Sequence, residues 1–195
     1  MCKMFFYDSP EYVKDKGTPD HYKSMCRDFR EGRVHAKNLK EKQKEVFLDR
    51  DWTINKYVSF LRNIDDFELI PRVTDAMKEI NVSGYLAIEV TNQSVIAKGE
   101  VSLAKLEEIH NKMETLLGWE WAYLDAIYYY PYNLYKGYGG EQPGDKIGRD
   151  CRKPKPGMLL QVAKDFNINL TSHRWWERCE GRMLPFSYWL SLLVK

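Results

Sequence analysis

The segment at residues 46–55 reads VFLDRDWTIN, an apolar run that ends in two carboxylates, Asp49 and Asp51. The run predicts a short buried strand over 46–48, with both acids beyond its carboxyl end. Open α/β sheets bind their ligands at that edge. Two carboxylates there can share a divalent cation, and one can attack an electrophile while the other moves a proton. The segment therefore outlines phosphoryl-transfer chemistry.

Length and composition indicate a globular protein of one domain. The chain has 195 residues, 44% hydrophobic and 30% charged, with a formal net charge of +2. This balance does not favour nucleic acid or an anionic membrane as a partner. No N-terminal secretion signal is visible, and the longest apolar stretch, 185–194, is about half of what a membrane-spanning helix needs. We expect a cytoplasmic monomer.

Strand and helix patterns alternate from residue 45 onward. The expected strands span 46–48, 85–90 and 123–130, and the expected helices span 72–80 and begin near Ser102 and Pro156. Such alternation implies right-handed crossovers and a mainly parallel sheet, which is an α/β fold. Glu89 places a charge inside the otherwise apolar strand 85–90 and conflicts with its pattern. His110 falls in a helical pattern, where a surface or boundary position is favoured over a catalytic one.

Three polar clusters fall at loops that such a sheet would bring together. They are Asp49 with Asp51, the triplet Thr91-Asn92-Gln93, and the basic segment 152–157 with Arg152, Lys153 and Lys155. A hydroxyl and two amides can hold phosphate oxygens, and a guanidinium with an ammonium can clamp a phosphoryl group. Each cluster alone is common in solvated loops. Their shared position after predicted strands favours a common site.

Together these segments resemble the haloacid dehalogenase (HAD) superfamily, in the branch of D,D-heptose bisphosphate phosphatase and histidinol-phosphatase. The resemblance rests on FLDRDWTIN at 47–55, VTNQSVIAKG at 90–99, IYY at 127–129 and CRKPKPGM at 151–158. It implies an HAD phosphatase domain over 45–172. Its fold would be the Rossmann-like three-layer α/β fold with a mainly parallel central sheet, incomplete in its C-terminal part.

The resemblance implies a phosphomonoesterase that uses Mg²⁺ and an aspartyl-phosphate intermediate. Asp49 would be the nucleophile and Asp51 the general acid and base, and both would bind Mg²⁺. Thr91 and Lys153 would steady the transferred phosphoryl group. The residues implied to contact the phosphorylated substrate are Arg50, Tyr57, Ser59, Asn92, Gln93, Ser94 and Arg152, and the segment 57–60 as a whole would face it. The implied substrate is a heptose bisphosphate. The alternatives are histidinol phosphate, or a catalytically dead remnant that at most binds sugar phosphate.

Three features depart from the family pattern. Trp52 stands where the family has a glycine, in a loop whose backbone approaches phosphate. The zinc ligands of the branch fall on Tyr130, Tyr132, Arg149 and Cys151, and one cysteine cannot form a tetrahedral site. The Gly-Asp metal motif expected soon after Leu170 is missing, and no aspartate occurs after Asp165. We therefore expect no structural zinc and impaired activity.

The two ends of the chain lie outside this resemblance. Residues 1–44 are polar and are interpreted as a linker or as a remnant of an upstream nucleotidyltransferase domain, because KGTPDHY at 16–22 is similar to the closing segment of such domains. Residues 173–195 form an atypical aromatic and apolar tail without helix caps or clear periodicity. Within it, Glu177 and Glu180 are the acids that could substitute for the missing aspartate.

Overall fold

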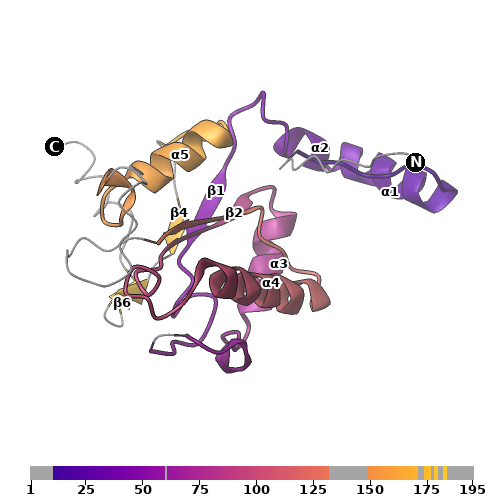
Figure 1. The fold of residues 1–195 in the computed structure, drawn as a ribbon. Coiled ribbons are helices and arrows are strands. Elements are labelled where there is room, and N and C mark those ends of the chain that lie inside the picture. Colours follow the sequence, from indigo (N-terminus) through magenta and orange to yellow (C-terminus); the bar gives the residue numbers. More distant parts are fainter. Residues whose placement is uncertain are drawn as a thin grey trace, which may run out of the picture.

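The computed structural model describes residues 11–59, 61–131 and 149–170, together with the backbone of the short strands at 174–176, 178–179 and 182–183. A parallel sheet with the strand order β3-β2-β1-β4 lies at its centre (Figure 1). Its strands are β1 Glu45–Leu48, β2 Leu86–Asn92, β3 Ala126–Tyr130 and β4 Arg174–Trp176. A separate antiparallel pair joins β5 Arg178–Cys179 to β6 Arg182–Met183.

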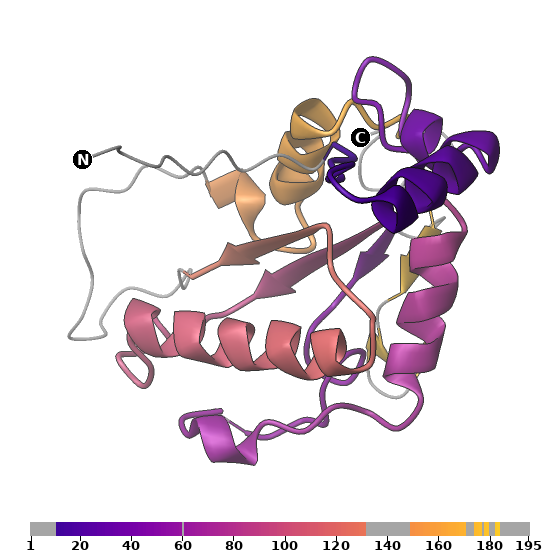
Figure 2. The ribbon, with the colours of Figure 1, turned by 90° about the vertical axis from the view of Figure 1, so that its right-hand side faces the viewer.

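Helices cover both faces of the sheet (Figures 1 and 2). Helix α5 (Gly157–Asp165) packs on one face, and α3 (Val73–Val82) and α4 (Leu103–Trp119) pack on the other. Two short 3-10 turns, η1 (Ile64–Asp66) and η2 (Arg149–Cys151), lie in the connections. This helix–sheet–helix layering confirms the predicted Rossmann-like α/β fold.

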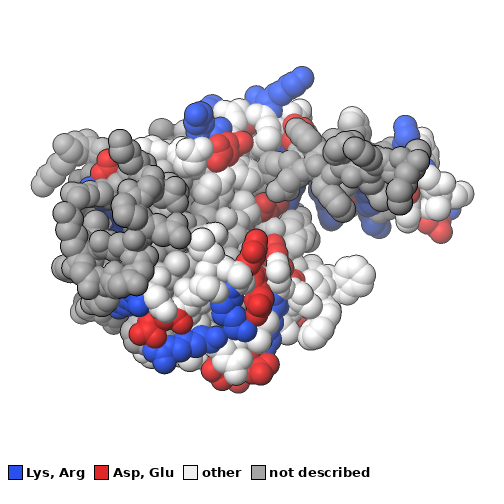
Figure 3. Space-filling model, viewed as in Figure 1, with Lys and Arg blue, Asp and Glu red and all other residues white. Residues whose placement is uncertain are grey.

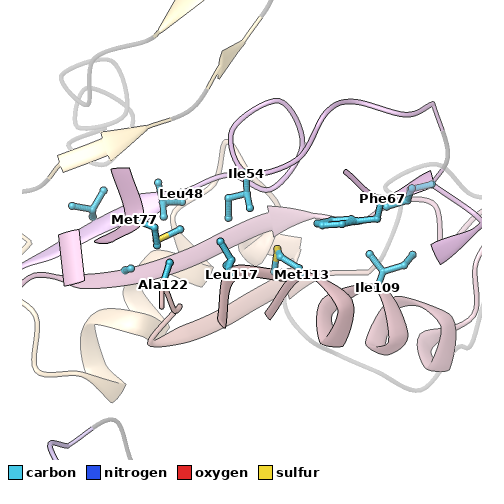
Figure 4. Packing of buried hydrophobic residues seen from close by; sticks show 11 residues of the cluster. Leu48, Ile54, Phe67, Met77, Ile109, Met113, Leu117 and Ala122 are labelled. Carbon is cyan, nitrogen blue, oxygen red and sulfur yellow. The ribbon is translucent and has the colours of Figure 1, made fainter. Parts of the chain in front are cut away.

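Strand β1 is apolar at successive positions because both of its faces are buried. Val46 and Leu48 pack in the cluster that contains α3 and α4, and Phe47 packs in the cluster on the α5 side. Figure 4 shows the first cluster, which gathers Leu48, Ile54, Phe67, Met77, Ile109, Met113, Leu117 and Ala122. The segment that ends in Asp49 is therefore held rigidly from both sides.

The expected elements form with shifted limits. Ser102 caps α4 as predicted, since its Oγ accepts a hydrogen bond from Lys105 N at 3.1 Å. The strand expected over 123–130 begins at Ala126, because the Tyr123 peptide is bound instead by the side chain of Asn81. The triplet expected to follow the second strand starts inside it. Thr91 and Asn92 belong to β2, which pairs with β3 as far as Asn92 opposite Tyr130.

The N-terminal segment contains two helices, α1 (Pro19–Arg30) and α2 (Arg33–Ala36), which project away from the sheet (Figure 1). Thr18 caps α1 by accepting a hydrogen bond from His21 N at 3.2 Å. Lys37 forms an ion pair with Asp125, whose other carboxylate oxygen accepts a hydrogen bond from Ala87 N at 2.8 Å. This contact ties the segment to the start of β2 and to the loop before β3.

The described part of the face in Figure 3 carries no single sign of charge. Lysine and arginine are interspersed with aspartate and glutamate over the described part of the face in Figure 3. Among the described helices, none is both long enough and apolar enough to cross a membrane.

Packing of α4 against the sheet gives a direct test of this fold. Leu117 is fully buried on α4, and Leu103 on the same helix is 56% exposed. We expect Leu117→Ala to lower the free energy of unfolding by about 2–5 kcal/mol, because it leaves a cavity in the α4-side cluster. The matched Leu103→Ala should cost less than about 1 kcal/mol. Urea denaturation measures both, and equal losses would contradict this packing.

Candidate active site

The two acids of the segment 46–55 lie at the carboxyl end of an inner strand, as predicted. Asp49 directly follows β1, and Asp51 stands two residues later. The chain then turns back on itself, since the carbonyl oxygen of Arg50 accepts hydrogen bonds from the backbone N–H groups of Thr53, Ile54 and Asn55. This tight loop keeps both carboxylates at the sheet edge where α/β proteins bind ligands.

The end of β2 reaches the same edge. The register places Leu48 opposite Glu89. The residues that follow Leu48 and Glu89 therefore lie at the same height along the sheet. The side-chain amide of Gln93 donates to Thr91 Oγ1 at 2.9 Å and lies 3.5 Å from Asp51 Oδ2. Thr91 and Gln93 are both buried. Gln93, implied by the family to contact substrate, thus positions the threonine hydroxyl beside the second acid.

Lys153 comes to the site from the loop before α5. Its Nζ lies 3.0 Å from Asp49 Oδ1, and its side chain is largely buried. Asn92 holds its backbone twice, since Asn92 Nδ2 donates to Lys153 O and Lys153 N donates to Asn92 Oδ1, both at 3.1 Å. Asn92 therefore sets the position of Lys153, a role that the sequence did not reveal.

The oxygens of Asp49 are not equivalent. Oδ1 accepts from Lys153 Nζ and also from the Arg50 backbone N–H at 3.0 Å. Within the described part of the chain, Oδ2 has no such donor. The carboxylate is thus fixed through one oxygen and presents the other for reaction.

Arg50 points towards Asp51 and away from solvent. Its Nε and Nη2 both lie within hydrogen-bonding distance of Asp51 Oδ1, at 3.2 and 3.1 Å, and Nη2 is 3.3 Å from Oδ2. Arg50 is only 3% exposed, so its side chain is a partner of the acid rather than a surface group open to substrate. In this arrangement Asp51 is held by the cationic side chain of its own neighbour in the sequence.

The loop accommodates Trp52 without collapsing onto the carboxylates. Its backbone adopts the left-handed conformation that glycine prefers, with φ of 67°. The indole is half-exposed and stacks on Tyr57, with ring centroids 5.2 Å apart and planes 6° apart. The half-exposed indole thus packs on Tyr57, while the backbone strain of a non-glycine residue remains.

The other residues implied to meet substrate are spread around this edge. Ser59 is exposed, Ser94 is half-buried in the turn after β2, and Arg152 is half-buried next to Lys153. Phe60, the last residue of the segment 57–60, lies outside the described residues.

Two buried titratable residues lie under the site. Glu89 is completely buried, and burial raises its pKa to about 8, an increase that Arg50 partly opposes. His110 on α4 is also buried, and burial lowers its pKa to about 4. Its Nε2 lies 3.8 Å from Glu89 Oε1. The surface or boundary position expected for His110 is therefore wrong, because α4 turns this residue towards the sheet.

The donor set suits Mg²⁺. Asp49 and Asp51 offer hard carboxylate oxygens, and Mg²⁺ usually binds to one or two carboxylates, waters and substrate phosphate. No cluster of three or more His, Cys, Asp or Glu residues suited to a metal is found in the described residues. Strand β4 runs parallel to β1 with Trp176 opposite Leu48, so that it also ends at this edge. Position 177, a glutamate directly after β4, and the expected motif position after Leu170 lie outside the described residues.

The zinc positions of the branch are used differently. Tyr130 is buried in the α5-side cluster, and Cys151 is a half-buried free thiol packed against the same cluster. Tyr132 and the side chain of Arg149 lie outside the described residues. At these two described positions, the side chains pack among apolar residues, whereas the branch has zinc ligands there.

The sequence of the chain matches that of known phosphatases. Residues 44–175 match the family model described as polynucleotide kinase 3 phosphatase. The chain belongs to this phosphatase family. D-glycero-beta-D-manno-heptose-1,7-bisphosphate 7-phosphatase from Haemophilus influenzae is a similar member, 40% identical over 129 residues, which are 66% of this chain and 67% of that enzyme. The enzyme of the same name from Escherichia coli K12 is 39% identical over 65% of this chain and 64% of its own length. The chain thus spans about two thirds of these family members.

Solved structures support the same family assignment. D,D-heptose 1,7-bisphosphate phosphatase from B. bronchiseptica, complexed with magnesium and phosphate, matches with a TM-score of 0.59 and 29% identity over 69% of this chain and 70% of that chain. A protein described as a HAD-like phosphatase from Mesorhizobium loti matches with a TM-score of 0.64 and 26% identity over 72% and 65%. These matches confirm the HAD resemblance and the fold it implies.

The zinc positions lead to a measurement. We expect the purified protein to contain no stoichiometric zinc, because three of the four ligand positions carry tyrosine, tyrosine and arginine. Elemental analysis after extensive dialysis checks this, and a Cys151→Ser variant serves as the control. About one zinc per chain, lost in the variant, would contradict the expectation.

Proposed function

We propose that this protein is a Mg²⁺-dependent phosphomonoesterase that hydrolyses a heptose bisphosphate through an aspartyl-phosphate on Asp49. The observation that carries the proposal is the meeting of Asp49, Lys153, Thr91 and Asp51 at one edge of the sheet. The similar enzymes act, by their names, on heptose 1,7-bisphosphate. Similarity to these enzymes favours heptose bisphosphate over histidinol phosphate as the proposed substrate.

The chemistry follows from the two carboxylates. Asp49 Oδ2 attacks phosphorus, the bond from phosphorus to the sugar oxygen breaks, and protonated Asp51 gives its proton to that oxygen. In the second step Asp51 takes a proton from water as the water attacks the aspartyl-phosphate. Inorganic phosphate leaves, and Asp49 is regenerated. Each residue thereby returns to its starting protonation state.

The surrounding groups orient the transferred phosphoryl group. Gln93 donates to Thr91 Oγ1, so that the threonine O–H is left to donate to a phosphoryl oxygen. The Lys153 ammonium balances charge beside Asp49. Mg²⁺ held by Asp49, and by Asp51 when its carboxylate is ionised, would supply further positive charge against the phosphoryl oxygens. Arg152 and the exposed Ser59 and Tyr57 are the proposed contacts to the rest of the substrate.

The proposal includes impaired activity in this chain. The Gly-Asp motif that would bring a further acid to the metal is missing from the sequence. Trp52 replaces a glycine beside Asp51, and Arg50 occupies the Asp51 carboxylate. The proposal also includes a monomeric, cytoplasmic protein without a nucleic-acid or membrane partner. The near-balanced charge of the chain supports the absence of those two partners.

Asp49 provides the first test. We expect Asp49→Asn to lower phosphate release by about 100-fold or more, because an amide cannot form the aspartyl-phosphate. Release from heptose 1,7-bisphosphate with and without Mg²⁺ measures this. Asp75→Asn is the control, since Asp75 is an exposed carboxylate on α3 away from the site. Equal rates for Asp49→Asn and the unaltered protein would sink the proposed function.

Trp52 provides the second test. We expect Trp52→Gly alone to recover little activity. Trp52→Gly combined with a Gly-Asp turn rebuilt after Leu170 should recover more activity than the sum of the two separate changes, because metal and phosphate share one site. The measurement is kcat/KM with Mg²⁺. Trp121→Gly is a matched control, since Trp121 is also a tryptophan at positive φ but is 88% exposed. An unaltered protein with a kcat of about 1–1000 s⁻¹ would refute the impairment.

A further inference from the structure

Glu89 is an acid placed in an apolar layer. Side chains alternate along β2, and Glu89 shares a face with Ala87, which packs in the α4-side cluster. Its lateral neighbours in the sheet are Leu48 on β1 and Ile127 on β3, both apolar. Glu89 is completely buried, and neither of its carboxylate oxygens has a hydrogen-bond partner in the described part of the structure.

Two further buried groups are also unsatisfied. His110 Nε2, 3.8 Å from Glu89 Oε1, is buried without a hydrogen-bond partner among the described residues. The same holds for Nη1 of Arg50, whose other nitrogens bind Asp51. The Arg50 charge is the largest electrostatic influence on both Glu89 and His110. Such unsatisfied buried groups are rare in proteins. Glu89 and His110 approach each other, and the charge of Arg50 acts on both of them.

We propose that Glu89 and His110 form a buried receiving site for the Arg50 guanidinium, which exchanges between Asp51 and this site. When Arg50 turns to Glu89, Nη1 donates to one carboxyl oxygen and the other oxygen pairs with His110 Nε2. All three unsatisfied groups are then satisfied. Asp51 is released from its bidentate partner and can donate and accept the protons of the reaction. Glu89 and His110 are thus positioning residues that act through Arg50.

This inference rests on the proposed function for the role of Asp51, but the exchange itself does not. Glu89, as an unpartnered acid in an apolar layer, costs stability, and replacing it with an apolar side chain of similar volume should stabilise the fold. If Glu89 has only a structural role, its replacement should raise the stability of the protein and leave kcat unchanged. If Glu89 is a positioning residue, its replacement should raise the stability and lower kcat.

The first experiment compares Glu89→Leu with the unaltered protein. We expect the variant to raise Tm by about 2–4 °C. We expect it to lower kcat for heptose 1,7-bisphosphate by about 10- to 100-fold, with KM changed less than about twofold. Glu45→Leu is the matched control, because Glu45 is a buried glutamate at the opposite end of β1, and it should leave kcat unchanged. If the unaltered protein turns over substrate, an unchanged kcat in Glu89→Leu overturns the proposal, as does a fall in kcat that accompanies a fall in Tm.

A double-mutant cycle tests whether Glu89 acts through Arg50. In a chain that already carries Arg50→Gln, adding Glu89→Leu should not lower kcat further, because the guanidinium that Glu89 would receive is gone. Independent, multiplying losses would overturn the proposal. His110→Leu alone should lower kcat by part of the loss that Glu89→Leu causes. In the Arg50→Gln background, His110→Leu should not lower kcat further.

A measurement without turnover separates this proposal from the proposed function. In ¹⁵N-arginine-labelled protein, the Nε–H resonance of Arg50, assigned with Arg50→Gln, should show exchange broadening that Glu89→Leu removes. A single sharp Arg50 resonance that Glu89→Leu does not shift overturns the exchange, even if phosphate release is normal. Exchange that is present in a protein without phosphatase activity supports the receiving site and removes only the proposed function.

Discussion

Parallel pairing of β1 with β2, in the register that sets Leu48 opposite Glu89, is the constraint on which the site depends. It brings the ends of two strands that are distant in the sequence to one edge of the sheet. Asp49 and Asp51 extend from one strand, and Thr91 and Gln93 belong to the end of the other. The pairing is stable because β1 buries apolar side chains on both faces, against α3 and α4 on one side and α5 on the other. A shift of one residue would turn Thr91 and Glu89 to the opposite face.

Two ion pairs, Lys153 with Asp49 and Arg50 with Asp51, lie at this edge and affect the two acids differently. Lys153 binds one oxygen of Asp49 and leaves the other unbound within the described residues, which suits a nucleophile. Arg50 binds Asp51 through two nitrogens, which opposes the proton transfers expected of that acid. The difference arises from reach. Lys153 comes from a separate loop clamped by Asn92, whereas Arg50 is the neighbour of Asp51 in the chain and folds back onto it.

Several features followed from the sequence because they depend on local patterns. An apolar run before two acids places those acids at a strand end, and Ser102 before a helical pattern caps a helix. Features that depend on neighbours distant in sequence did not follow. Thr91 and Asn92 continue β2 because β3 lies beside them, and His110 is buried because α4 packs on the sheet with that side inward. The hydrogen bonds that join Asn92 to Lys153 and Gln93 to Thr91 also depend on such neighbours.

The sequence by itself determined the α/β class, the order of strands and helices from β1 to α5, and the residue types of the site, because periodicity and strand-end motifs are local properties of the chain. It did not predict the helices α1 and α2 or the strand β4. Only the tertiary structure decided which of those residues touch: that Lys153 meets Asp49, that Arg50 is buried against Asp51, and that Glu89 and His110 lie together behind them. The physical reason is that hydrogen bonding and burial depend on distances across the sheet and between layers. Such distances are set by register and packing, which single positions in a sequence do not encode.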